Sequence, residues 1–280
     1  MNSLKIFEDS RYWLLAIGSG SIAIHLTLIW RSENIDVIGT SLLFWFSAAI
    51  LIWERKDDLE LESDPISTIL GMFLVGLVLF RSLSISGYDI FLRLAPFISA
   101  LGLGLIASGI KGMKQYWQEL LIVGFIAIPP GLMLSIINIS PATAKFTHFI
   151  LWYLGFNVTR QGIHLILPPA SLEVASGCSG MTIILQILGL SLLVLLMFPS
   201  TLRQKILLPI AGILVGFVVN SARVCLMTYL LAFSGKKAFE YWHYGDGSLI
   251  FSMIAIAIFG VFCWFTVLRD EPKNSQTRNE

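Results

Sequence analysis

The chain has 280 residues, of which 56% are hydrophobic and only 13% are charged, and its mean hydropathy is +0.79. Soluble globular domains carry about 25% charged residues, so most of this chain is expected to be solvated by lipid. A formal net charge of +1 supplies no basic stripe, which argues against nucleic acid as a partner. The three cysteines, Cys178, Cys225 and Cys263, are too far apart to indicate a zinc site or a disulfide framework.

Hydropathy predicts an all-α integral membrane protein, a bundle of about eight transmembrane helices that each approach the roughly 20 residues needed to cross a bilayer. The first span is too long for a signal peptide and lacks a small-residue cleavage site. Residues 1–268 are expected to form one membrane-embedded domain, followed by a polar, disordered tail over residues 269–280. The predicted spans are Tyr12–Trp30, Ile35–Trp53, Pro65–Leu83, Ile90–Ile110, Glu119–Ile137, Ser179–Phe198, Ile206–Phe233 and Ser248–Leu268.

The distribution of Lys and Arg predicts the orientation of this multi-pass protein in the cell membrane. Cytoplasmic segments carry an excess of these residues, and here the excess places both termini inside. The segments that contain Cys178 and His243 then lie on the extracytoplasmic side. Arg223 lies past the middle of its span, and a long side chain can extend several Å toward the surface. The three side chains are therefore expected to meet at the extracytoplasmic face.

The longest predicted outer segment runs from Ile139 to Gly177 and contains short runs of alternating apolar residues around Pro168-Pro169. This alternation predicts a small β-hairpin that leads into Cys178, although an irregular loop fits the same pattern. A hairpin would offer an edge to an extended peptide. The alternating residues are Val158, Ile163, Leu165, Leu167, Leu172 and Val174.

Cys178 is a candidate nucleophile because it lies in a turn of small residues directly before an apolar helix. A helix N-terminus favours a thiolate, which is the reactive form of cysteine. Gly177 and Gly180 leave room beside the sulfur, and Ser179 with the amides of Gly180 and Met181 can stabilise an oxyanion. The alternative is that these small residues only begin a tightly packed membrane helix.

Arg223 is the ionisable residue deepest in a predicted span. Arginine at a bilayer centre costs about 2.5–3.5 kcal/mol on insertion scales, so a cavity or a partner must offset this cost. Asn220 lies three residues earlier on nearly the same helical face. The alternative role for Arg223 is structural, through a backbone carbonyl or a carboxylate such as Glu173.

His243 is the candidate proton acceptor because imidazole titrates near neutral pH. Its aromatic neighbours Tyr241, Trp242 and Tyr244 also fit an interfacial belt, in which the histidine would have no catalytic role. Asp246 is expected to cap the last helix or to orient the ring. The other three histidines are His25, expected to form hydrogen bonds within the bundle, and His148 and His164, loop residues that can take the place of His243.

Three motifs in this order resemble the exosortase/archaeosortase family, and the cyanobacterial exosortases in particular. They are Ala175-Ser-Gly-Cys-Ser-Gly180, Asn220-Ser-Ala-Arg223 and His243-Tyr-Gly-Asp-Gly247. The resemblance covers residues 155–268, and the earlier spans match in number and hydrophobicity.

The resemblance implies a membrane-embedded cysteine transpeptidase or protease without a metal or an organic cofactor. Family members act on secreted proteins that end in a Pro-Glu-Pro-like signal (PEP-CTERM), a transmembrane helix and a basic cluster, and transfer the new carboxyl end to a surface acceptor. Cys178 would form the acyl-thioester, Arg223 would be proton donor or charge partner, and His243 would stabilise the transition state or transfer protons. Archaeal relatives have a second arginine in place of this histidine.

Two functions from other classes fit the same sequence. A transporter could bind an anionic solute through Arg223 near the membrane midplane. A non-catalytic membrane scaffold would retain the helices and need none of the three side chains. Loss of Cys178 distinguishes these alternatives from a cysteine enzyme, because only the enzyme requires its sulfur.

Overall fold

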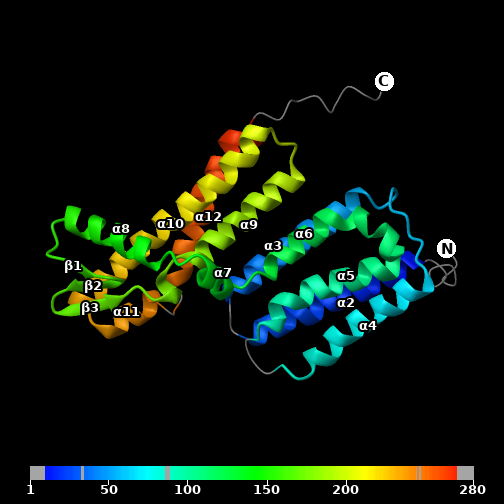
Figure 1. The fold of residues 1–280 in the computed structure, drawn as a ribbon, viewed down its shortest axis with the longest axis horizontal. Coiled ribbons are helices and arrows are strands. Elements are labelled where there is room, and N and C mark those ends of the chain that lie inside the picture. Colours follow the sequence, from blue (N-terminus) through cyan, green and yellow to red (C-terminus); the bar gives the residue numbers. More distant parts are fainter. Residues whose placement is uncertain (1–9, 33–34, 86–88, 244, 246, 270–280) are drawn as a thin grey trace. The chain divides into compact units, whose positions relative to one another are not determined.

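The computed structural model describes residues 10–32, 35–85, 89–243, 245 and 247–269, and most of these residues are helical. The chain divides into two compact units, Met1–Pro129 and Pro130–Glu280, and each is described by itself (Figure 1). The sequence-based prediction of one domain over residues 1–268 with a disordered tail stays a prediction.

The N-terminal unit is a helical bundle whose helices are joined by buried polar contacts. His25 Nε2 lies 2.8 Å from the carbonyl oxygen of Leu92, and Trp45 Nε1 donates to His25 Nδ1 at 3.1 Å. The prediction that His25 forms hydrogen bonds within the bundle is therefore confirmed. The unit comprises α2 (Ser10–Arg31), α3 (Ile35–Glu54), α4 (Pro65–Ser82), α5 (Phe91–Gly112), the 3-10 turn η1 (Met113–Tyr116) and α6 (Trp117–Ile126).

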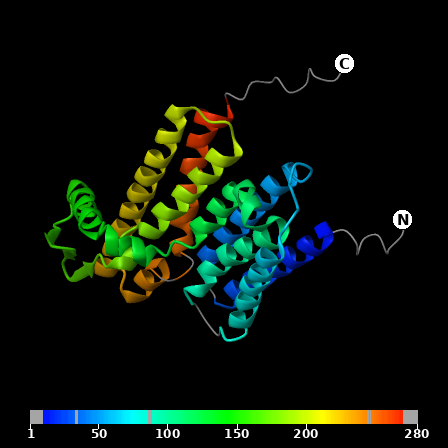
Figure 2. The same ribbon diagram turned by 45° about the vertical axis from the view of Figure 1, so that its right-hand side comes forward.

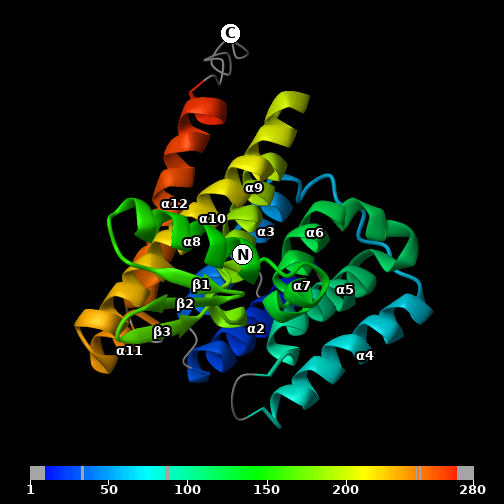
Figure 3. The same ribbon diagram turned by 60° about the vertical axis from the view of Figure 1, so that its left-hand side comes forward.

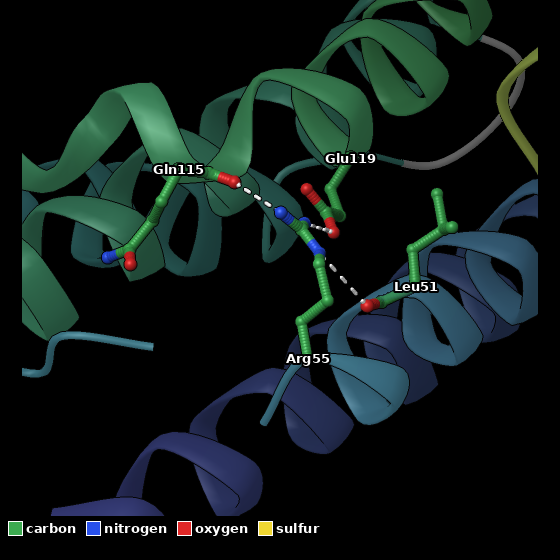
Figure 4. Close-up of polar contacts among 4 residues, drawn as sticks. All are labelled: Leu51, Arg55, Gln115 and Glu119. Atoms are coloured by element: carbon green, nitrogen blue, oxygen red, sulfur yellow. Dashed lines mark hydrogen bonds and ion pairs between the residues drawn. The ribbon is translucent and has the colours of Figure 1, made fainter. Parts of the chain in front are cut away.

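An ion pair connects the end of α3 with α6 in this unit (Figure 4). Arg55, directly after α3, pairs through Nη2 with Glu119 Oε1 and donates through Nη1 to the carbonyl oxygen of Gln115 at 3.0 Å. Its Nε donates to the carbonyl oxygen of Leu51 at 3.4 Å. The side chain of Glu119 is almost fully buried and that of Arg55 is about one-third exposed. The carboxylate thus depends on Arg55 for its compensating charge.

Within the described ranges, five helical segments are long and apolar enough to cross a membrane, and two apolar helices are shorter. Large apolar side chains such as Trp30, Phe80 and Trp264 are exposed on these helices, as a surface that faces lipid requires. The chain is thus an all-α polytopic membrane protein. The five segments are Arg11–Arg31, Pro65–Ser82, Phe91–Ile126, Leu202–Phe233 and Gly247–Val267, and the shorter helices are Ile38–Glu54 and Met181–Met197.

One predicted span is wrong in its extent. The segment Glu119–Ile137 is not a single helix, because α6 ends at Ile126 and α7 (Pro130–Ile136) begins separately after Pro129. Pro129 and Pro130 have no backbone N–H to donate to the preceding turn, so the helix cannot continue through them. Pro130 is instead the first residue of α7, a position that proline favours.

The C-terminal unit carries the three motifs on elements that surround one long helix. Helices α9, α10 and α12 pack side by side (Figures 1 and 2), and a small sheet lies beside α10 (Figure 3). The unit comprises α7, α8 (Ser140–Tyr153), β1 (Thr159–Gln161), β2 (His164–Leu167), β3 (Ala170–Glu173), the 3-10 turn η2 (Ser176–Cys178), α9 (Met181–Met197), α10 (Leu202–Phe233), α11 (Lys236–His243), α12 (Gly247–Cys263) and the π-helical turn η3 (Trp264–Leu268).

The predicted β-hairpin is present and belongs to a three-stranded antiparallel sheet of order β1-β2-β3. Leu167 pairs with Ala170, so Pro168-Pro169 forms the two-residue turn. The alternating pattern places Leu165 and Leu172 on the buried face, where they pack with Val224 of α10. The sheet is therefore fixed on α10 just before the chain reaches Cys178.

Close packing of α9 on α10 positions the rest of the site. A Cβ added to Gly216 of α10 would lie 2.9 Å from the Cα of Ile184 of α9, so no side chain fits there. Small residues of this kind let membrane helices approach at backbone distance. Asn220 lies one turn further along α10 and Arg223 follows after almost another turn, so both positions are fixed against the start of α9.

Candidate active site

Cys178 lies at the end of the turn η2, outside the helix that follows. Its amide donates to the carbonyl oxygen of Ala175 at 2.9 Å, and α9 begins only at Met181. The predicted span begins at Ser179, which is two residues too early. The reason is Gly180, whose φ of +96° is left-handed and which separates the turn from α9. Cys178 is buried, with 3% of its surface exposed.

Two buried side chains hold the backbone around the sulfur. Asn220 Nδ2 donates to the carbonyl oxygen of Cys178 at 2.9 Å, and Thr143 Oγ1 of α8 donates to that of Ser179 at 2.7 Å. A Cβ at Gly180 would lie 2.7 Å from Asn220 Nδ2, so glycine is needed for this approach as well as for its φ. The segment Ser176–Ser179, referred to as the cysteine turn, is thus held by hydrogen bonds to both α8 and α10.

His243 is the histidine that the structure brings to the sulfur. Its Nε2 lies 3.0 Å from Cys178 Sγ, a hydrogen-bond contact. The residue ends α11, and its ring stacks on Phe239 one turn earlier, with centroids 5.0 Å apart and planes 17° apart. Of the two other candidates, His148 lies on α8 and His164 is exposed on β2.

Arg223 is buried, and its Nη2 donates to the carbonyl oxygen of His243 at 2.9 Å. Of the two partners expected for a structural arginine, a carbonyl or a carboxylate, this contact is with a carbonyl. Because Asn220 and Arg223 are three residues apart on α10, one helical face contacts the backbone of both Cys178 and His243.

Burial and charge change the protonation of the pair in defined directions. Burial raises the pKa of the Cys178 thiol, and the positive charge of Arg223 opposes this by lowering it. Burial also lowers the pKa of His243, and Arg223 lowers it further. At neutral pH the resting pair is therefore a thiol beside a neutral imidazole, in which Nε2 can accept the proton of the sulfur.

The groups expected to stabilise an oxyanion are mostly engaged within the turn. Ser179 Oγ donates to the carbonyl oxygen of Ser176 at 2.7 Å and accepts the amide of Met181 at 3.3 Å. The amide of Ser179 also donates to Ser176, at 3.3 Å. Among the described residues this leaves the amide of Gly180 as the candidate donor, and the oxyanion roles stay predictions.

An open cleft of about 340 Å³ adjoins the turn that carries Cys178. Ala175 and Ser176 line it directly before the cysteine, and Glu173 is the charged residue among its lining residues. The other lining residues are Leu134, Ser135, Asn138, Ser140 and Ile163.

A family model described as Transmembrane exosortase (Exosortase_EpsH) matches residues 30–260 of the chain. The chain belongs to the exosortase family. The match includes Cys178, Arg223 and His243, and it confirms the family that the three sequence motifs indicated. No curated protein and no solved structure matches this exosortase.

Two site residues of this exosortase were not found by sequence reasoning. Phe239 had a usable signal, because it precedes His243 by four residues in a helical segment. Thr143 had none, since nothing in the sequence links α8 to the turn that contains Ser179. The role expected for Asp246 falls outside the described residues.

Proposed function

We propose that this exosortase is a membrane-embedded cysteine transpeptidase. It would cleave the C-terminal PEP-CTERM-like sorting signals of secreted proteins and transfer the new carboxyl end to a surface acceptor. The observation that carries the proposal is the 3.0 Å contact between Cys178 Sγ and His243 Nε2, made by a buried thiol. A nucleophile in hydrogen-bond contact with a base whose position is itself fixed is the usual arrangement for covalent catalysis.

In the first half of the reaction, His243 Nε2 accepts the proton of Cys178 as the sulfur attacks the scissile carbonyl carbon. The carbonyl π electrons move to oxygen and form a tetrahedral oxyanion. When this intermediate collapses, the C–N bond breaks and the imidazolium gives its proton to the leaving amine. The product is an acyl-thioester on the sulfur of Cys178.

In the second half, an acceptor O–H or N–H group gives its proton to His243 and attacks the thioester carbonyl. The C–S bond breaks, and the sulfur leaves as a thiolate that regains its proton from the imidazolium. Transfer to a surface acceptor and hydrolysis by water differ only in which nucleophile arrives. The scheme uses the chain's own side chains and requires no metal or organic cofactor.

Arg223 fits the role of charge partner better than that of proton donor, because a guanidinium in a protein stays protonated. Its positive charge lowers the pKa of Cys178 and so favours the thiolate that forms during attack. Its hydrogen bond to the His243 carbonyl oxygen also fixes the backbone that carries the imidazole.

The proposed substrate enters from the bilayer as a helix and meets the site at the extracytoplasmic surface. Reporter fusions after Lys205 and after Lys237 test this orientation. The first fusion is expected to report the cytoplasm and the second the opposite side. A cytoplasmic signal at residue 237 would contradict the proposed position of the site.

The deciding experiment replaces Cys178 by Ala and by Ser and follows the C-terminal processing of a candidate substrate by gel shift. Both variants are expected to abolish processing, whereas Cys263→Ala, which changes another buried thiol in α12, is expected to retain it. Normal processing in Cys178→Ala would refute the nucleophile assignment. A transporter or a scaffold would retain its function in that variant.

A further inference from the structure

The strand β3 (Ala170–Glu173) leads directly into the turn that holds Cys178, and within the described part of the chain one of its edges is not paired with another strand. The sheet has the order β1-β2-β3, so β2 covers only one edge of β3. Only Val174 and Ala175 separate the end of the strand from η2. Any chain that pairs with the outer edge would therefore lie close to the candidate nucleophile.

The register determines which backbone groups of β3 point outward. The amide of Val174 donates to the carbonyl oxygen of Ile163 at 2.9 Å, which makes these two residues a hydrogen-bonded pair. Such pairs alternate along an antiparallel ladder with pairs that exchange no hydrogen bonds. Ser171 and Glu173 belong to the second kind, so their N–H and C=O groups point away from β2. Both residues are exposed.

The cleft beside the site begins where this edge ends. Glu173 lines it together with Ala175 and Ser176, so the cleft joins the end of β3 to the turn η2 that ends at Cys178. The volume of about 340 Å³ is sufficient to admit substrate side chains. The lining combines hydroxyl, amide and apolar groups, which suits a peptide.

We propose that β3 binds the sorting signal as an added β-strand, in which Ser171 and Glu173 exchange backbone hydrogen bonds with an extended substrate peptide. The cleft receives a side chain of that peptide next to the scissile bond. Recognition through an added strand depends on main-chain hydrogen bonds, and the pocket supplies selectivity. The inference rests on the proposed transpeptidase function, since it assigns the peptide-binding part of the same site.

The test compares Ser171→Pro with Ser171→Ala in the full-length protein, with a synthetic signal peptide as substrate. Proline at position 171 removes the outward N–H and leaves the hydrogen bonds between β3 and β2 in place, as proline on an edge strand does. Relative to Ser171→Ala, the proline variant is expected to lose about 2- to 12-fold in kcat/KM, the value of one backbone hydrogen bond. Equal kcat/KM values for the two variants would overturn the proposal.

A second measurement uses the unaltered protein and so does not depend on folding of a variant. Peptides that carry a single N-methyl group at successive positions are compared with the parent peptide. Cleavage is expected to fall at alternate positions on one side of the scissile bond, because alternate amides of a strand face its partner. If all the N-methylated peptides are cleaved equally and cleavage still requires Cys178, the added strand is refuted and the proposed function is not. Cleavage by Cys178→Ala would instead refute the proposed function.

Discussion

Replacement of Gly180 by alanine tests whether this residue sets the position of the cysteine turn. An L-residue at φ +96° is strained, which costs about 1–2 kcal/mol. The new Cβ would lie 2.7 Å from Asn220 Nδ2, so the amide must move and leave the buried carbonyl oxygen of Cys178 without its donor. That loss costs about 1–3 kcal/mol, which gives a total of about 2–5 kcal/mol.

The assay is denaturant unfolding of the detergent-solubilised protein, with Gly177→Ala as the matched control. A Cβ at Gly177 meets no atom within 4 Å, so this change is expected to stay within about 0.5 kcal/mol of the parent. Processing by Gly180→Ala is expected to fall about a hundredfold, as for a nucleophile displaced by about 1 Å. Equal unfolding midpoints for the two variants would refute the reasoning.

The remaining predictions concern two arginines, the buried Arg223 and the partly exposed Arg55. Arg223→Gln removes a charge that lowers the pKa of both Cys178 and His243, so the pH profiles of thiol alkylation and of processing should both move to higher pH. The acid limb of processing should lie below pH 6.5 in the parent, because His243 must lose its proton and its pKa is lowered from 6.5; unmoved profiles would contradict the role of Arg223. Arg55→Gln leaves the buried carboxylate of Glu119 without its cation and should destabilise the protein by about 3–5 kcal/mol. Glu119→Gln should lower the free energy of unfolding by only about 1 kcal/mol. A larger loss for Glu119→Gln than for Arg55→Gln in denaturant unfolding would refute the account of this ion pair.

Several features of the fold could be predicted from sequence because they depend on local pattern. Apolar stretches of the right length indicated the membrane helices, and alternation around Pro168-Pro169 indicated the hairpin. Contacts between distant segments could be predicted only where motifs marked the residues, as for Cys178, Arg223 and His243. The ion pair between Arg55 and Glu119 joins residues 64 positions apart, and neither residue lies in a motif.

The start of α9 shows the limit of hydropathy in the site itself. The apolar run begins directly after the small residues, so hydropathy favours a helix that begins at Ser179. The left-handed conformation of Gly180 ends the cysteine turn first and delays the helix to Met181. Glycine is required here by its left-handed φ and by the close approach of Asn220, and neither feature can be read from the sequence.

The spacing of the Asn-x-x-Arg motif now has a physical explanation. Residues three apart lie on one face of a helix, and on α10 that face contacts two separate segments. Asn220 binds the carbonyl oxygen of Cys178, and Arg223 binds that of His243. Because both contacts are to backbone, a single turn of a packed membrane helix fixes the two chain segments whose side chains meet at 3.0 Å. The cost of a buried arginine is thus offset by a hydrogen bond that holds the imidazole beside the sulfur.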